Sequence, residues 1–579
     1  MRVLSVREFV LFLLPFVHAV PIASCTRHLP CPTRCRYLPG DPEWPNREAW
    51  STLNDTVGGR LIRGVPLGQS CQARTYSHAA CSKILDGWTL LTPFVDDPVN
   101  VMSPYWTNNS CSPFTMSEGD GDRGCTLGNL AQYAINVSSA RDVMAGLKFA
   151  QERNLRLTIK NTGHDFLGRS TGKGSLALWM HNLKETTFLR YSSDFYTGSA
   201  VRLGAGVEYG DVYPEASARG YRLAGGASPT VSVVGGFSQG GGHGPLGSAY
   251  GLAADQVLEW EVVTAAGKAL TASPNENTDL YWALAGGGPG NYAVVLSATV
   301  RTYTDGTVSG AGFSFTNTGD TAAFWGAVTA WLQHMMVLDT VKGFSTVFSL
   351  TAKSFSLVYA TVPDSQSTKI VDEALTPFLE GLANLDVSIG GHYESNVHAT
   401  FADHYDYWSP RMTYDSNITL GSGLVPRATV QDDNDLAALV TVFQKITAGG
   451  ALILSVGQNV QNNSHPSNAV LPSWRDALFT TTFARPLSAN AEWEAIRDTQ
   501  EQLNIWQDGL RVVTRQGGAY MNEATWDNSH WKEDYFGLNY DTLLSIKQKY
   551  DPDHLFWVNA GIGSDLYWRI DNEERLCRV

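Results

Sequence analysis

A polar loop that directly follows a helix and a strand is the feature that most constrains this chain. Residues 139–154 have the apolar spacing of a helix, and Ser139 is placed to cap it. Residues 155–159 alternate apolar and polar side chains, which predicts a half-buried strand. Residues 160–170 then read Lys-Asn-Thr-Gly-His-Asp-Phe-Leu-Gly-Arg-Ser. Because Gly163 tolerates positive φ and close approach, the backbone N–H groups of this loop can turn toward an anion.

A glycine-rich run forms the second motif. Residues 225–244 contain eight glycines in twenty positions, interleaved with apolar residues such as Val231 and Phe237 that favour burial. Glycine at this density costs backbone entropy, so we expect another group to approach the backbone closely here. Residues 236–240 also fit G-x-S-x-G, the nucleophile elbow of a secreted serine hydrolase. That elbow needs a helix directly after the serine, and the glycines at 240–242 oppose one, so this alternative is remote.

Two further motifs follow along the chain. Residues 250–257 lead into a strand, and residues 279–292 predict a short helix that ends in a glycine run and re-enters a strand. Near the C-terminus, Tyr520-Met521-Asn522-Glu523 follows Gly-Gly-Ala. A glycine run would be weak alone, so the order of these motifs carries the signal.

Taken in order, these four motifs resemble the flavoprotein superfamily of vanillyl-alcohol oxidase and para-cresol methylhydroxylase (PCMH). They are most similar to its berberine-bridge-enzyme-like branch of secreted fungal type. The resemblance runs from about residue 125 to residue 303 and resumes at the C-terminus. It implies an α+β fold with two lobes: a PCMH-type FAD-binding domain, and a substrate domain built on an antiparallel sheet covered by helices.

The resemblance implies that His164 carries FAD covalently through the 8α-methyl carbon of the flavin. Many members have a cysteine, bonded to flavin C6, where this chain has Ser228, so attachment through His164 alone is expected. Val231 takes a position that resembles the family's oxygen gate. The other residues expected to bind the cofactor are Asn161, Thr162, Gly163, Asp165, Gly225, Gly226, Thr230, Gly235, Gly236, Gly240, Gly241, Gly242 and His243.

The same resemblance makes Tyr520 a catalytic acid–base candidate and Asn522 its hydrogen-bonding partner. An ordinary tyrosine has a pKa of about 10, so Tyr520 can act as a base only if a cation or a polar environment lowers that pKa. Packing of Tyr520 against the flavin ring stays an alternative.

The N-terminus and the cysteines indicate export. Residues 1–19 combine two arginines, an apolar run too short to span a bilayer and a small-residue end, which is typical of a cleaved signal peptide. Seven of the eight cysteines lie between residues 25 and 125, and the last is Cys577. In an oxidising compartment they allow up to four disulfides, with the connectivity open. Zinc is the rival interpretation, but the spacings lack a second ligand pair, so no metal is expected.

The charge and the sequons restrict the partners. The 42 basic and 56 acidic residues give a net charge of −14, which argues against nucleic acid and anionic membranes. Five sequons are compatible with N-glycans: Asn54, Asn108, Asn136, Asn417 and Asn462.

These features divide the 579 residues into five parts. We expect a signal peptide at 1–19, a cysteine-rich N-terminal cap at 20–124, an FAD-binding domain at 125–305 and a substrate-binding domain at 306–510. A berberine-bridge-like segment at 511–579 is expected to return to the FAD site.

The resulting hypothesis is a secreted FAD-dependent oxidase. A base takes a proton from a substrate hydroxyl or amine, hydride passes from the adjacent carbon to the flavin, and O₂ is the acceptor. Ser228 in place of cysteine favours a secondary-metabolite intermediate as the substrate. A carbohydrate oxidase of the same family and a non-catalytic flavin-binding glycoprotein stay open as alternatives.

Overall fold

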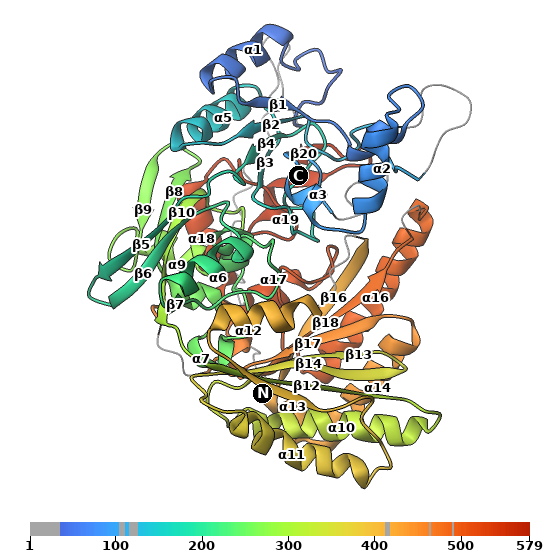
Figure 1. Ribbon diagram of the computed structural model, residues 1–579. Coiled ribbons are helices and arrows are strands. Elements are labelled where there is room, and N and C mark those ends of the chain that lie inside the picture. The colour runs from blue at the N-terminus through green and yellow to red at the C-terminus, as the bar shows by residue number, and fades with distance from the viewer. Residues whose placement is uncertain (1–34, 103–109, 115–124, 412–416, 462–464, 489–490) are drawn as a thin grey trace, which may run out of the picture.

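The computed structural model of the protein describes residues 35–102, 110–114, 125–411, 417–461, 465–488 and 491–579. The chain forms two lobes (Figure 1): the upper lobe contains a four-stranded and a five-stranded sheet with two two-stranded pairs, and the lower lobe contains one large sheet. The expected two-lobed α+β fold is confirmed. The expected signal peptide, Cys25, Cys31, Asn108 and Asn462 lie outside the described residues. The domain boundaries stay predictions.

A four-stranded sheet in the upper lobe carries the polar loop. Its order is β1-β2-β4-β3, where β4 pairs in parallel with both β2 and β3, and β1 pairs antiparallel with β2. The strands are β1 (Leu61–Arg63), β2 (Tyr133–Asn136), β3 (Leu157–Lys160) and β4 (Leu176–Trp179). Helices α1 (Arg47–Thr56) and α5 (Ala140–Glu152) pack against this sheet through a shared apolar core.

Helix α5 is confirmed, with a different cap. Ser139 occupies the N-cap position, but its side chain makes no capping hydrogen bond. The carboxylate of Asp142 in the first turn instead accepts hydrogen bonds from the backbone N and the Oγ of Ser138, at 2.9 and 2.8 Å. A carboxylate at this end also complements the helix dipole.

Strand β3 is buried except at Ile159, which is partly exposed, so the expectation that its apolar residues are buried and its polar residues exposed is wrong. Its polar residues Thr158 and Lys160 are 4% and 0% exposed. The polar residues are buried because the segment before residue 100 packs against this strand: the Lys160 ammonium donates hydrogen bonds to the carbonyl oxygens of Phe94, at 2.8 Å, and of Asp97. This segment therefore covers the side of the strand that the alternating pattern predicted to face solvent.

The second sheet of the upper lobe is antiparallel and five-stranded. In spatial order its strands are β5 (Thr186–Ser192), β6 (Thr197–Gly204), β10 (Ala293–Arg301), β8 (Val257–Thr264) and β9 (Ala269–Ala272). Helix α6 (Tyr209–Ala218) and the glycine-rich run lie between β6 and β8 in the chain, and β7 (Tyr221–Arg222) pairs with β11 (Tyr303–Thr304). Helix α9 (Thr278–Leu284) ends in the expected glycine turn, where Gly288 has φ +97°, and the chain enters β10.

The lower lobe is a seven-stranded antiparallel sheet. Its order is β15 (Glu394–His398), β12 (Val308–Thr316), β14 (Ser354–Pro363), β13 (Ser345–Leu350), β17 (Leu452–Gly457), β18 (Ala477–Pro486) and β16 (Ile418–Pro426). Its larger core is shared with the helices α10 (Thr321–Leu338), α11 (Lys369–Ala383), α14 (Asp433–Ala448) and α16 (Trp493–Val513). Helix α12 (Phe401–Trp408) lies on the other face, toward the upper lobe (Figure 1).

After α16 the chain returns to the boundary between the lobes. Leu424 of β16 donates its backbone N–H to the carbonyl of Gly518 at 2.8 Å, which fixes the start of the Tyr520 motif at the sheet edge. The upper lobe then gains α17 (Trp531–Tyr535), α18 (Tyr540–Tyr550), α19 (Ser564–Tyr567), β19 (Trp568–Ile570) and β20 (Leu576–Arg578). The remaining helices are short: α2 (His78–Gly87), α3 (Thr92–Val95), α7 (Gly247–Tyr250), α8 (Ala253–Gln256), α13 (Arg427–Gln431) and α15 (Ser473–Asp476).

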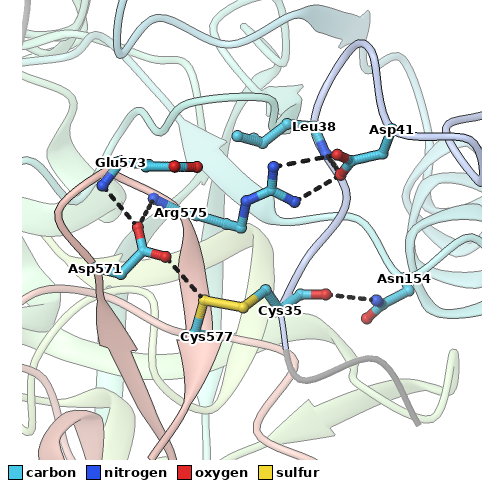
Figure 2. Close-up of a disulfide and its surroundings, with 8 residues drawn as sticks. All are labelled: Cys35, Leu38, Asp41, Asn154, Asp571, Glu573, Arg575 and Cys577. Atoms are coloured by element: carbon cyan, nitrogen blue, oxygen red, sulfur yellow. Dashed lines mark hydrogen bonds and ion pairs between the residues drawn. A yellow bond between two sulfur atoms is a disulfide. The ribbon is translucent and has the colours of Figure 1, made fainter. Parts of the chain in front are cut away.

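Three disulfides join the described cysteines: Cys35–Cys577, Cys71–Cys81 and Cys111–Cys125. The first closes the two ends of the chain across 542 residues (Figure 2), beside the ion pair of Arg575 with Asp41 at 2.7 Å. Because Cys35 and Cys577 are bonded to each other, the group that they form with Asp571 is a disulfide site, not a zinc site. Among the residues described, no helix combines the length and the apolar character that crossing a membrane requires.

Candidate active site

A large cavity lies where the two lobes meet and contains residues from every motif. It encloses about 1800 Å³, a volume that includes space open to solvent. The expected site residues that line it are Asn161, Thr162, Gly163, His164, Asp165, Gly226, Ser228, Val231, Gly236, His243, Tyr520 and Asn522.

The other expected residues lie behind this wall. They are Gly225, Thr230, Gly235, Gly240, Gly241 and Gly242. A Cβ at four of them would collide with a neighbouring side chain: at Gly225 with Tyr209, at Gly235 with Asn161, at Gly240 with Asn522 and at Gly242 with Phe237. These glycines therefore let neighbouring side chains approach the loop, and their contact with the cofactor stays a prediction.

His164 is held as a neutral imidazole at the cavity wall. Burial, together with the charge of Lys160, lowers its pKa to about 4. A hydrogen bond of 2.7 Å joins its Nε2 to the Oγ1 of Thr230. A neutral imidazole keeps a lone pair that can attack an electrophilic carbon, so His164 has the chemistry that the expected flavin linkage needs.

A chain of hydrogen bonds connects the polar loop to the C-terminal motif. The carboxylate of Asp165 accepts from Arg169 Nε at 2.7 Å, and the guanidinium of Arg169 donates to Asn522 Oδ1 at 2.9 Å. The amide nitrogen of Asn522 then donates to the hydroxyl of Tyr520 at 2.9 Å and to the carbonyl of Gly236 at 3.1 Å. Asn522 is therefore Tyr520's hydrogen-bonding partner, and the two motifs are held in one arrangement.

Tyr520 does not meet the condition for acting as a base. Its side chain is buried, and this burial, with the nearby carboxylate of Glu523, raises its pKa far above the usual value. Asn522 and Arg169 lower it by less than burial raises it. Tyr520 therefore keeps its proton at neutral pH and serves as a hydrogen-bonding hydroxyl, packed edge-on against His243 and Trp474.

Glu523, which the sequence analysis did not identify, supplies an ionised carboxylate. It lines the cavity with 30% of its side chain exposed. Burial raises its pKa, but the His243 charge and hydrogen bonds with His243 and Thr482 outweigh this effect, so the net pKa is lowered. Its oxygens lie 3.3 Å from His243 Nε2 and 2.9 Å from Thr482 Oγ1. The only signal in the sequence was its place directly after Asn522.

The lower lobe lines the opposite part of the cavity with strand residues that sequence reasoning also missed. They are Val347, Tyr359, Ile418, Leu454, Val456, Thr480 and Thr482. Apolar residues and threonines are ordinary in a sheet, so nothing in the sequence distinguished the strand face that meets the cavity.

The unpaired polar groups of the cavity fit a bound dinucleotide. Ser228 Oγ and His243 Nδ1 are buried and have no hydrogen-bonding partner among the described residues, and both side chains line the cavity. Buried polar atoms are normally satisfied, so a ligand is expected to complete them. Gly163 has φ +83°, and the absence of a side chain lets a ligand approach the loop backbone closely. The residues present thus suit FAD.

The serine-hydrolase alternative fails at Ser238. Its side chain is 1% exposed, and its Oγ donates to the carbonyl of Val233 within the same turn. A nucleophile must be accessible to substrate, which this hydroxyl is not.

Comparison with known proteins agrees with this site. Residues 131–273 match the FAD binding domain family, and residues 519–563 match the berberine and berberine-like family. The chain is 40% identical to the VAO-type flavoprotein oxidase VAO615 of Thermothelomyces thermophilus, over 96% of this chain and 97% of that protein. The chain belongs to the vanillyl-alcohol oxidase family. It is an FAD-linked oxidoreductase of the family's berberine-bridge-like branch.

Two further likenesses support this membership. The bifunctional decalin synthase calF of Penicillium decumbens is 41% identical over 94% of this chain and 96% of that protein. The crystal structure of MtVAO615 from Myceliophthora thermophila C1 superimposes with a TM-score of 0.89 at 39% identity, covering 94% of this chain and 100% of that chain.

Proposed function

We propose that the protein is a secreted oxidase that takes hydride from a C–H next to a hydroxyl or amine, with FAD bound covalently through His164. The observation that carries the proposal is the ionised carboxylate of Glu523 in the cavity that also contains His164. The name of the relative VAO615, a flavoprotein oxidase, supports O₂ as the acceptor.

The chain's own groups can move the proton. FAD supplies the hydride acceptor when bound. Glu523 accepts the proton of the substrate hydroxyl or amine, in place of the expected base Tyr520, while His243 and Thr482 hold the carboxylate in position. The protonated hydroxyl of Tyr520, oriented by Asn522, offers a hydrogen bond to the substrate oxygen.

The substrate class that we propose is a secondary-metabolite intermediate. The relative calF is named a decalin synthase, which supports this choice over a sugar. Solved carbohydrate oxidases share only 17–18% identity with this chain, so their likeness concerns the fold alone. The apolar strand residues of the lower lobe, such as Val347, Leu454 and Val456, also suit a hydrophobic substrate.

The last part of the proposal is that the protein is secreted. Three disulfides are compatible with an oxidising compartment. Of the described sequons, Asn54 and Asn136 are partly exposed, whereas Asn417 is buried and is a poor acceptor for a glycan. We propose only a small organic substrate and O₂ as partners.

The deciding experiment measures flavin reduction and reoxidation separately. Metabolite-like and sugar substrates are screened by peroxide release, and the active one is used to bleach the flavin under anaerobic conditions. We expect air to restore the yellow colour within seconds. Slow return in air, with fast turnover on a quinone, would make the protein a dehydrogenase.

Val231 provides the matched variant for this experiment. It lines the cavity three residues after Ser228. One added methylene can close a small gap in a packed wall. We therefore expect Val231→Leu to slow reoxidation at least tenfold while leaving anaerobic reduction unchanged.

A further inference from the structure

A second cavity lies on the other side of Trp557 from the cofactor site. It encloses about 1360 Å³, including space open to solvent, and is walled by the C-terminal segment, the start of α16 and the residue before β3. Trp557 lines both cavities, so its indole separates them. None of the residues assigned above to FAD or to the reaction lines this second cavity.

Tryptophan dominates the apolar part of its wall. Trp493, Trp526, Trp531 and Trp557 all line it. Trp493, the first residue of α16, is 44% exposed, although a large aromatic side chain is normally withdrawn from water. Four indoles around one hollow present flat apolar faces with polar edges.

The polar part of the wall contains an unsatisfied donor and an unsatisfied acceptor. Arg156 is 5% exposed and Asn129 is 9% exposed. Among the described residues, neither Arg156 Nε nor Asn129 Oδ1 has a hydrogen-bonding partner. The guanidinium of Arg156 is held in place by the ring of Trp557 at 5.1 Å and by the carbonyl of Thr171 at 3.2 Å. Buried polar atoms left in this state indicate that another molecule completes them.

The charges around the cavity do not favour an ion. Arg156 and Arg569 are balanced by Asp527, Asp565 and Glu574, which line the same hollow. A strong field of one sign, which an anionic or cationic ligand would require, is therefore missing from this wall.

We infer that this cavity binds a neutral oligosaccharide. A sugar ring has an apolar face of C–H groups that packs on indole, and its hydroxyls both donate and accept hydrogen bonds, as Arg156 Nε and Asn129 Oδ1 require. The site holds the glycan and does not oxidise it, because Trp557 separates it from the cofactor cavity. It is thus independent of the proposed oxidase substrate.

The test is calorimetric titration of the flavin-loaded protein with cellohexaose, chitohexaose, mannohexaose and xylohexaose. We expect at least one of them to bind with a submillimolar Kd and to leave the flavin absorbance unchanged. Trp493→Ala should weaken that binding at least tenfold, and Arg156→Met should do the same. The matched control is Ile505→Ala, an even more exposed apolar position on the same helix α16 that does not line the cavity, which should bind as the wild type does.

Each alternative outcome overturns the inference. If no oligosaccharide binds at millimolar concentration, water alone fills the cavity. If binding persists unchanged in Trp493→Ala and Arg156→Met, with thermal unfolding showing both variants folded, the sugar binds elsewhere. If binding bleaches the flavin, the sugar occupies the cofactor cavity and is a substrate.

Discussion

At the scale of single residues, Glu523 and Tyr520 differ in protonation state: Glu523 is ionised and Tyr520 keeps its proton. Neighbours of Glu523 lower the pKa of its carboxyl, whereas burial raises the pKa of Tyr520. A general base must be deprotonated, so activity should be lost only as the pH falls through the lowered pKa of Glu523. We therefore expect the acid limb of kcat/KM to lie below about pH 4.3, the ordinary value for glutamate.

The substitution Glu523→Gln keeps the shape and removes the base. We expect kcat/KM to fall about 10²–10⁴-fold, with the acid limb abolished. Tyr520→Phe removes only a hydrogen bond and should cost about tenfold without moving that limb. An unchanged acid limb in Glu523→Gln, or one that moves in Tyr520→Phe, would assign the base to another group.

His164 makes a second residue-scale prediction. His164→Ala should fold and still bind FAD through the remaining wall of the cavity, but release it on denaturation. The measurement is flavin fluorescence of the protein band after an SDS gel. A tryptic map of the wild type should contain one flavin peptide, which includes His164. A fluorescent band in the variant, or a second flavin peptide containing Ser228, would contradict the single linkage.

At the scale of elements, the glycine-rich run positions the C-terminal motif. A methyl group at Gly240 would lie 2.4 Å from Asn522 Nδ2, and this amide is already fixed by Arg169, Gly236 and Tyr520. Gly240→Ala should therefore displace Asn522 and lower kcat/KM at least tenfold, while the protein stays folded. Steady-state kinetics with a thermal melt measure both effects.

The control for this prediction is Gly381→Ala in helix α11. A methyl group there meets open space, and alanine favours a helix by about 1 kcal/mol over glycine. This variant should keep full activity and be slightly more stable. Full activity in Gly240→Ala as well would show that the position of Asn522 is unimportant.

At the scale of the whole molecule, the bond between Cys35 and Cys577 ties the ends of the chain together. It lies in a cluster where Asn154 donates to the carbonyl of Cys35 at 2.9 Å and Arg575 pairs with Asp41 (Figure 2). Replacing both cysteines by alanine should lower the free energy of unfolding by about 2–5 kcal/mol, measured by urea denaturation.

The matched control is the Cys71–Cys81 pair, which closes a loop of only 10 residues. A shorter loop restricts the unfolded chain less, so its double alanine variant should lose less stability. Equal losses of unfolding free energy in the two double variants would mean that the disulfides stabilise the protein through native contacts and not by restricting the unfolded chain.

The sequence by itself determined the family, the FAD cofactor and twelve of the residues at the cavity wall. Those conclusions depend on local chemistry: a loop after a strand, a run of glycines, and a tyrosine two residues before an asparagine. Helices α5 and α9 also followed from local sequence patterns.

Only the tertiary structure decided which group is ionised and which strand faces line the cavity. Glu523 meets His243 across 280 positions, and Arg169 meets Asn522 across 353. A pKa depends on burial and on charges brought together by folding, so the sequence could not show that Tyr520 keeps its proton while Glu523 loses it. The pairing of Cys35 with Cys577 was undetermined for the same reason, because both ends of the chain must first reach one sheet edge.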